Sequence, residues 1–481
     1  MTIDMRPKKA LFLLCLPDEL LVEIISHLPP KDVIPLHATS RRLRALTRLD
    51  PTLWRSLCSY REGSSLTVLT PPRTPISDVE CATIDWYTEY KFRNAPTRML
   101  WVGTGSPTVG DEVKGIGAFP SRGGSTEDDM VVAATSDGSV KIWSLQDNCA
   151  AREIGKSERG LIFSQKKRTP ALEAQQKIRE AGIVDGVSID AAAGRIWVAG
   201  EDGLVEIDLT SLKRISTHRF PFSIMALSQT SSPYPLTIGT TLTLHMHDSR
   251  VSPNSPPPAH APLFQPGPLS ILHSGSSVKV AGRFPSLLSY DRRGWPKLTS
   301  TIHSGARLCG LTTIGTSGLA ACGEYNGRGT LEIYPGLGSP YPIVKNRQTA
   351  ARSKILTVTS HGSYLVTGNA EGCISFFERD ARTVIREHWV EGGGKTSSGI
   401  WNVGEDGGDV IRRVKPLRGG DGKILVWAGD RLGLLGVGKE RQEIPEEAVR
   451  PESEEEEYLT KMRELLRRQG EEVGILEGMG L

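Results

Sequence analysis

Long apolar runs are missing from this sequence, and aromatic residues are few. Phe, Trp and Tyr make up only 6% of the chain, and no segment approaches the roughly 18 apolar residues of a membrane-spanning helix. The apolar residues 10–16 follow Lys8 and Lys9 as in a signal peptide, but they lead into Pro17 without a small-residue cleavage site. We therefore expect no membrane contact and an intracellular location, cytoplasmic, nuclear or both.

Paired cysteines and an excess of one charge are also missing. The seven cysteines are widely scattered, with no C-x-x-C pair and no Cys/His cluster. This distribution predicts reduced thiols and argues against a disulfide framework or a cysteine-bound zinc ion. The formal net charge of +3 over 481 residues is nearly balanced, which argues against a nucleic-acid partner.

Familiar catalytic motifs are absent as well. The sequence contains no G-x-S-x-G, no phosphate-binding P-loop, no H-E-x-x-H and no dinucleotide fingerprint between a strand and a helix. His245 and His247 alternate along a predicted strand and could share a metal, but no third ligand is visible. We expect no catalytic residue, no metal and no cofactor. An enzyme whose site residues come from separate loops would, however, leave no local motif.

Glycine and proline are abundant, with 51 and 31 residues respectively. Such a composition indicates many turns, as in an all-β body with unstructured insertions. A chain of this length also exceeds one ordinary domain, so we expect two or more units.

The first unit is a helical segment at residues 16–57. Leu20, Leu21, Ile24, Ile25 and Leu28 recur at helical spacing and predict a single apolar stripe. A second helical stretch is expected after an N-cap at Asp32, with Pro35 in its first turn, and a third begins at Asp50 and carries Trp54. Three short helices bury little apolar surface alone, so we expect a partner to cover part of the stripe.

This segment resembles the F-box, the helical module that docks on the Skp-type adaptor of cullin-RING ubiquitin ligases. The matching positions are Leu16, Pro17, Glu19, Leu20, Ile24, Leu28, Pro29, Asp32, Val33, Ser40, Leu43, Leu46, Asp50 and Trp54. The family often has an aromatic residue where this chain has Leu43. The resemblance implies that Trp54 holds the module together and that a set of apolar residues contacts the adaptor. That set is Leu16, Pro17, Leu20, Ile24, Leu28, Pro29 and Val33.

Residues 61–98 are expected to form a polar, Pro-rich linker and then a connecting helix. Trp86, Tyr90 and Phe92 lie at near-helical spacing, with their rings on one side. F-box proteins with a propeller commonly have such a helix at the join, which implies that it sets the angle between the two modules. The alternative is a surface helix that packs only on its own domain.

From residue 99 onward the hydrophobic period changes to that of strands. Residues 130–143, MVVAATSDGSVKIW, indicate two strands joined by an Asp-Gly hairpin. A similar strand–turn–strand pattern occurs at residues 195–208 and 364–377, and weaker copies occur at residues 236–248, 279–290, 318–334 and 425–435. Four of the six intervals between copies are about 40 to 45 residues, the length of a four-stranded propeller blade.

The repeat resembles a degenerate WD-repeat propeller, and seven copies predict seven blades. The fold class is therefore an α+β multidomain chain: a three-helix F-box at residues 11–60, then an all-β propeller at residues 99–438. Residues 99–102 are expected to complete the last blade. Residues 151–181, 249–268 and 391–422 are expected to be solvated insertions, and residues 439–481 an acidic tail with a short helix.

The resemblance implies a substrate receptor of an SCF-type ubiquitin ligase, in which the F-box binds the adaptor and the propeller binds a client protein. Catalysis would then occur elsewhere in the assembly. Arg292, Arg293 and Arg328, in predicted turns, are candidates for binding a phosphate or acidic motif of the client. An interaction scaffold without client delivery and a propeller hydrolase are the alternatives.

Overall fold

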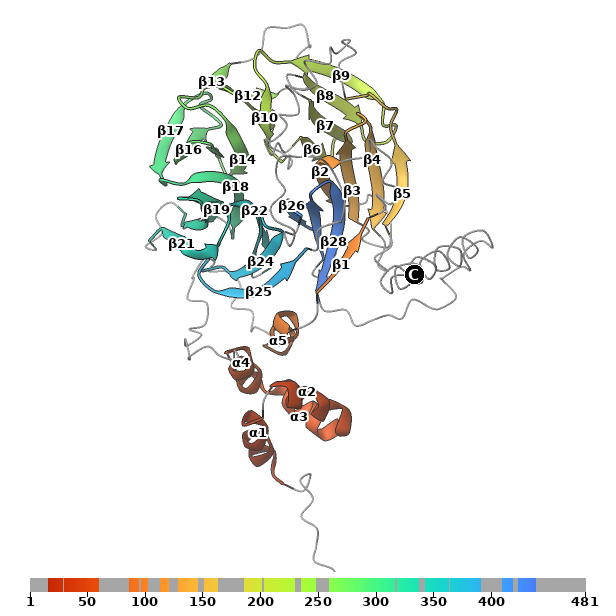
Figure 1. The fold of residues 1–481 in the computed structure, drawn as a ribbon, viewed down its shortest axis with the longest axis vertical. Helices are drawn as coiled ribbons and strands as arrows, with labels where there is room; N and C mark the ends of the chain where they lie inside the picture. The colour runs from red at the N-terminus through yellow and green to blue at the C-terminus, as the bar shows by residue number, and fades with distance from the viewer. Residues whose placement is uncertain are drawn as a thin grey trace, which may run out of the picture. The chain divides into compact units, whose positions relative to one another are not determined.

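A computed structural model of the chain has five helices and seven four-stranded sheets within the residues that it describes (Figure 1). The described ranges are 16–28, 30–59, 86–94, 97–102, 113–120, 129–145, 151–162, 186–200, 203–229, 235–247, 259–315, 318–336, 342–362, 364–390, 409–417 and 423–437. The predictions for residues 61–85, 171–181 and 439–481 lie outside them. None of the described helices is long and apolar enough to cross a membrane.

The N-terminal segment forms four short helices where the sequence predicted three. They are α1 (Asp18–Ser26), α2 (Pro30–Thr39), α3 (Arg41–Leu49) and α4 (Pro51–Ser59). Ser40 divides the stretch that was predicted to continue from Asp32, because its side chain accepts a hydrogen bond from the Arg42 amide at 3.2 Å and begins a new helix. Asp32 therefore lies in the first turn of α2, and Pro35 lies inside that helix.

The seven sheets are the blades of a propeller, and each is a four-stranded antiparallel meander. Blade 1 contains β2 (Val113–Pro120), β3 (Asp129–Thr135), β4 (Val140–Leu145) and β5 (Ala151–Lys156). Blade 2 contains β6 (Val187–Asp190), β7 (Arg195–Gly200), β8 (Gly203–Asp208) and β9 (Arg214–Arg219). Blade 3 contains β10 (Ile224–Leu227), β11 (Leu236–Thr240), β12 (Thr243–His247) and β13 (His260–Pro262). Blade 4 contains β14 (Pro268–Ser274), β15 (Ser277–Gly282), β16 (Ser286–Asp291) and β17 (Leu298–His303).

The remaining three blades complete the ring. Blade 5 contains β18 (Arg307–Ile314), β19 (Gly318–Tyr325), β20 (Arg328–Tyr334) and β21 (Val344–Ala351). Blade 6 contains β22 (Ile355–His361), β23 (Tyr364–Asn369), β24 (Cys373–Glu378) and β25 (Val384–Trp389). Blade 7 combines β26 (Ile411–Pro416), β27 (Ile424–Ala428) and β28 (Arg431–Val437) with β1 (Thr97–Trp101), a strand from the other end of the propeller sequence.

The closing strand β1 pairs antiparallel with β28, as the sequence predicted for residues 99–102. Met99 lies opposite Leu435 and Trp101 lies opposite Gly433, and the ladder continues with a hydrogen bond of 2.8 Å from the Val102 amide to the Leu432 carbonyl. This pairing removes the free edge that β28 would otherwise expose. In Figure 1 the first strand therefore lies beside the last.

All seven predicted hairpins are present, and each forms the second and third strands of a blade. The clearest one turns at Gly138, whose φ of 77° suits glycine. The Asp137 side chain accepts hydrogen bonds from the Ser139 amide at 2.9 Å and the Thr135 hydroxyl at 2.7 Å. Burial by itself would raise the pKa of Asp137, but these hydrogen bonds outweigh burial and lower it.

The predicted insertions contain strands that the sequence did not reveal. Ala151–Lys156 is the outer strand of blade 1, His260–Pro262 is the outer strand of blade 3, and Ile411–Pro416 is the inner strand of blade 7. Outer strands of this propeller are exposed over most of their length, as β5 shows. A strand without a fully buried face lacks the alternating apolar pattern that predicts one.

We predict that Gly433→Val destabilises the propeller by about 1 to 3 kcal/mol, because an added side chain overpacks the closing strand. A Cβ atom at Gly433 would lie 2.8 Å from the Met99 sulfur and 3.1 Å from the Trp101 ring. Urea unfolding of the full chain measures the change.

Gly436→Ala is the matched control, since a Cβ atom there has its nearest neighbour, the Arg98 carbonyl oxygen, at 4.0 Å. Its free energy of unfolding should change by less than about 0.5 kcal/mol. Equal stability of the Gly433 variant and the wild type would show that β1 does not close the ring.

Candidate functional site

Helix α1 has two apolar faces, where the sequence predicted one stripe. Leu21 and Ile25 are 1% and 3% exposed and pack in the helical core. Leu20 and Ile24, one turn apart, are 51% and 42% exposed. The inner pair therefore holds the helices together, and the outer pair is available to a partner.

The other predicted adaptor contacts are arranged differently. Leu16 and Leu28 are half-buried against the helical core, and Pro17 is exposed and precedes α1. Val33 is 0% exposed and belongs to the core, so its predicted surface contact with an adaptor is inconsistent with this structure. Pro29 lies outside the described residues.

Trp54 anchors the helical core, as expected. Its indole nitrogen donates a hydrogen bond of 2.7 Å to the Thr47 carbonyl. Its ring contacts Tyr87 at 4.8 Å and Tyr90 at 5.0 Å between centroids, and both tyrosines lie in α5 (Trp86–Asn94). Burial raises the pKa of Tyr90. The connecting helix is thus packed into the F-box core.

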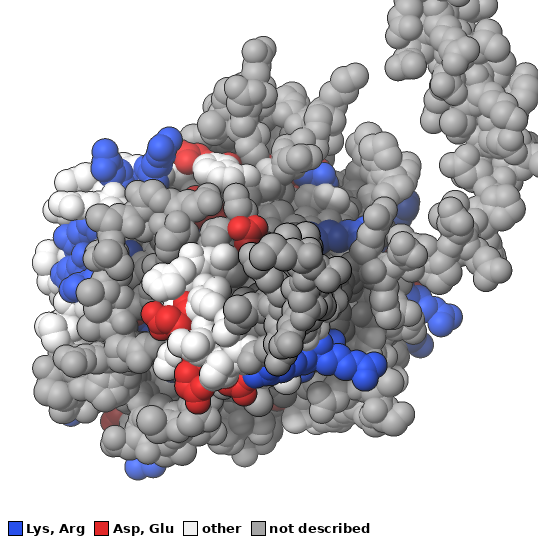
Figure 2. Space-filling model, turned by 90° about the horizontal axis from the view of Figure 1, so that it is seen from below, with Lys and Arg blue, Asp and Glu red and all other residues white. Residues whose placement is uncertain are grey.

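Two of the N-terminal helices carry exposed charges of opposite sign, and an ion pair of 2.5 Å between Arg42 and Asp18 joins them. Asp18, Glu19 and Glu23 are exposed on α1, beside the outer apolar pair. Four exposed arginines lie on α3: Arg41, Arg42, Arg44 and Arg48. Figure 2 shows acidic side chains among uncharged surface, with basic side chains both next to them and farther away. A partner of α1 must therefore accept an apolar pair with acidic surroundings.

Helix α5 also contacts the propeller, so the predicted link between the two modules is present. The Phe92 ring stacks on Tyr364 at 4.5 Å and meets Phe376 edge-on at 5.8 Å. Arg93 forms an ion pair of 2.9 Å with Glu378, and both side chains are largely buried. One nine-residue helix therefore packs Tyr90 into the F-box core and Phe92 onto blade 6.

The two faces of the propeller follow from the alternation of antiparallel strands. Connections between first and second strands, and between third and fourth strands, lie on one face, and the second-to-third hairpins lie on the other. Tyr364 begins a second strand and Glu378 ends a third strand, so α5 contacts the first of these faces. We call it the α5 face and the opposite one the hairpin face.

The three candidate arginines do not lie together. Arg292 and Arg293 follow β16 on the α5 face, where the Arg293 amide donates a hydrogen bond of 3.0 Å to Asp291. Arg328 is exposed and begins β20, so it lies on the hairpin face. A single client motif cannot contact all three.

The inner strands surround a central channel with a cavity of about 220 Å³. The described residues that line it include Arg413 and Lys415 from β26, and none of them is acidic. The Lys415 ammonium donates a hydrogen bond of 2.9 Å to Gln229, which follows β10. The channel thus favours anionic groups. The sequence did not indicate this channel, because residues 391–422, which contain β26, were predicted to be an insertion. The basic residues at alternate positions 413 and 415 were the signal that could have indicated a strand with a basic face.

These features define a protein class: a small helical domain joined by one helix to a seven-bladed propeller. The family model described as F-box-like matches residues 13–60. A solved structure described as "Crystal structure of RRP9 WD40 repeats" is similar, with a TM-score of 0.51, 11% identity, and coverage of 71% of this chain and 99% of that one. At this identity the similarity concerns the fold alone. No curated protein matches the sequence. The chain therefore carries an F-box-like domain followed by a WD40-like propeller.

We predict that Phe92→Ala loosens α5 from the propeller. Loss of a core phenylalanine costs about 3 to 5 kcal/mol, and about 2 kcal/mol is expected for this half-buried ring. Tryptic cleavage after Arg93 should then accelerate about 30-fold, because native-state proteolysis follows the population of the open form.

Phe222→Ala is the control, since it removes an exposed phenylalanine from the turn between β9 and β10. Cleavage after Arg93 should be unchanged in this variant. An unchanged rate in the Phe92 variant as well would mean that the ring does not hold the junction.

Proposed function

We propose that this chain is the substrate-recognition subunit of an SCF-type cullin-RING ubiquitin ligase. In this proposal the F-box-like domain binds a Skp-type adaptor, and through it the cullin-RING assembly, while the propeller binds a client protein. The observation that carries the proposal is the exposed pair Leu20 and Ile24 on a helix whose opposite face completes the core of an F-box-like domain.

The exposed pair supports adaptor binding on energetic grounds. Full burial of one leucine or isoleucine side chain contributes about 1.5 to 3 kcal/mol. Leu20 and Ile24 are 51% and 42% exposed, so covering both supplies about half of the total for two side chains, about 1.5 to 3 kcal/mol, which is about 10- to 100-fold in affinity. The core residues of the helical domain are already buried without a partner, so adaptor binding does not require the helices to unfold or rearrange.

The propeller supports client binding through the hairpin face. Helix α5 contacts the α5 face through Phe92 and Arg93, so the hairpin face lies away from that attachment. Arg328 is exposed there, and the basic central channel is lined by strands that run between both faces. We therefore place an acidic or phosphorylated client motif on the hairpin face.

The proposed role of the chain is to bind and position, with catalysis left to other subunits of the assembly. Holding a client beside the ubiquitin-carrying enzyme converts an encounter between two molecules into an intramolecular one and raises the effective concentration. The assembly would act inside the cell, in the cytoplasm, the nucleus or both.

The first test is adaptor binding by the full-length double variant Leu20→Asp/Ile24→Asp. We expect at least tenfold weaker binding in a titration with purified adaptor, without loss of thermal stability, because both side chains are exposed. Phe264→Asp places the same charge on an 86% exposed propeller residue and should bind normally. Normal binding by the double variant would refute the proposed contact.

The second test concerns the client and the choice of face. We expect Arg328→Glu to reduce recovery of ubiquitinated clients at least tenfold while adaptor binding is unchanged, and Arg293→Glu on the α5 face to have little effect. Quantitative proteomics of the ubiquitinated proteins purified from cells that express each variant measures this recovery.

The outcomes separate the alternatives. If only Arg293→Glu reduces client recovery, the client binds the α5 face. If the adaptor binds but no protein changes its lifetime in any variant, the chain acts as a scaffold without client delivery.

A further inference from the structure

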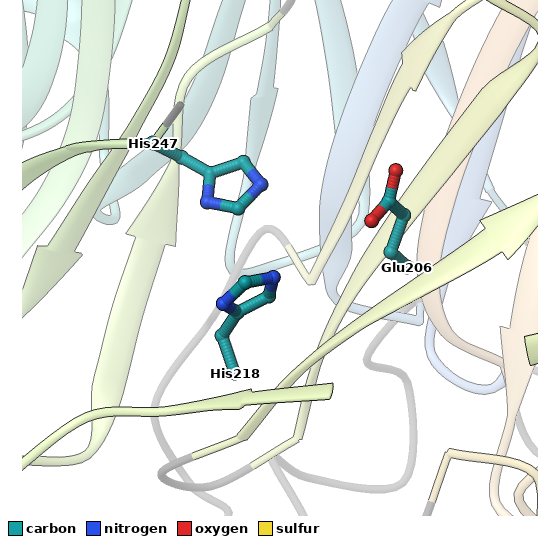
Figure 3. Close-up of side chains that lie close together, drawn as sticks. All are labelled: Glu206, His218 and His247. Atoms are coloured by element: carbon teal, nitrogen blue, oxygen red, sulfur yellow. The ribbon is translucent and has the colours of Figure 1, made fainter. Parts of the chain in front are cut away.

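Three potential metal ligands converge between blades 2 and 3, in a part of the structure that the proposed function does not use. They are Glu206 from β8, His218 from β9 and His247 from the end of β12 (Figure 3). One ligand atom from each residue lies within 4.8 Å of the others. The centroids of the two imidazole rings are 4.8 Å apart, with the ring planes at 76°.

We propose that Glu206, His218 and His247 bind a zinc ion that links blades 2 and 3. Two imidazole nitrogens and one carboxylate oxygen are a donor set that Zn²⁺ prefers, and a third protein ligand leaves the fourth position open. The set contains too few oxygens for Ca²⁺ or Mg²⁺ and no thiolate.

The spacing of the donors is close to that of a bound ion. Donor atoms about 2.0 to 2.2 Å from a tetrahedral zinc ion lie about 3.4 Å from one another. The largest separation here, 4.8 Å, exceeds that value by about 1.4 Å. His218 and His247 are half-buried, and a rotation of their side chains is the movement that would close this difference.

The surroundings of Glu206 hold its carboxylate in place. The side chain is 5% exposed, and the Ser216 hydroxyl donates a hydrogen bond of 2.7 Å to its Oε2. Such outer hydrogen bonds orient ligands in metal sites. Arg195 approaches the other oxygen, Oε1, at 3.6 Å, beyond hydrogen-bond distance. A carboxylate has about four lone-pair positions, so both contacts leave room for a metal.

An aromatic side chain lies beside the second histidine. The Trp197 ring meets His247 edge-on at 6.3 Å between centroids and packs against its imidazole.

The proposed ion would join two blades that are also held by apolar packing and by a hydrogen bond of 2.7 Å from the Ser188 hydroxyl to the Ser228 carbonyl. Trp197 and Leu204 of blade 2 pack on Ile224, Leu236 and Ile238 of blade 3 in one hydrophobic cluster. Glu206 and His218 belong to the first blade and His247 to the second. Metal binding should therefore stabilise this blade interface, and the open fourth position can accept water or a side chain of a bound protein.

The test is zinc binding by the full-length chain, which is stripped of metal with a chelator, dialysed, incubated with Zn²⁺ and dialysed again to remove the excess. We expect one tightly bound Zn²⁺ per wild-type chain, measured by competition with a chromophoric chelator and by elemental analysis. His247→Ala and Glu206→Gln should each weaken binding at least tenfold, since loss of an outer-shell partner alone costs 10- to 100-fold. His361→Ala, at a half-buried histidine of blade 6, is the matched control and should bind as the wild type does.

Thermal unfolding gives a second readout that does not depend on counting ions. Zn²⁺ should raise the Tm of the wild type and of His361→Ala by the same amount and that of Glu206→Gln by less, because stabilisation follows the affinity of the folded state. Glu206→Gln keeps the size of the side chain and an oxygen that can accept from Ser216, so its fold should survive. The proposal is overturned if the wild type retains no stoichiometric zinc, or if both site variants bind zinc as tightly as the control.

Discussion

The pairing of β1 with β28 is the constraint on which the rest of the architecture depends. Five residues at 97–101 complete blade 7 opposite residues 433–437, so the ring closes only when the start and the end of the propeller sequence meet. Helix α5 ends at Asn94, directly before this strand. Closure of the ring therefore also fixes the end of the helix that carries Tyr90 into the F-box core and Phe92 onto blade 6.

This linkage gives each surface a separate task. The F-box-like domain completes its own core with Leu21, Ile25 and Trp54 and leaves Leu20 and Ile24 exposed. The α5 face of the propeller is the face of attachment, and the hairpin face lies away from it. The proposed receptor would hold an adaptor and a client at the same time, which needs two such separate surfaces.

The sequence predicted the parts of the fold in which buried positions are marked by a regular spacing of apolar residues. The second and third strands of each blade are buried, as residues 131–134 and 365–368 show, and their hairpins were found in all seven blades. Outer strands such as β5 were missed because exposure removes the pattern.

The two faces of α1 were predicted as one stripe because Leu20 and Leu21 are equally apolar, and only packing assigns one of them to the core. The Glu206, His218 and His247 cluster was missed because three strands from two blades bring it together.

Hydrogen exchange of the full-length chain, with and without the purified Skp-type adaptor, tests the central claim most directly. The account predicts that adaptor binding slows exchange in α1, around Leu20 and Ile24, and leaves the propeller amides unchanged. A complex in which α1 exchanges as fast as in the free chain, or in which protection appears on the propeller, would contradict it.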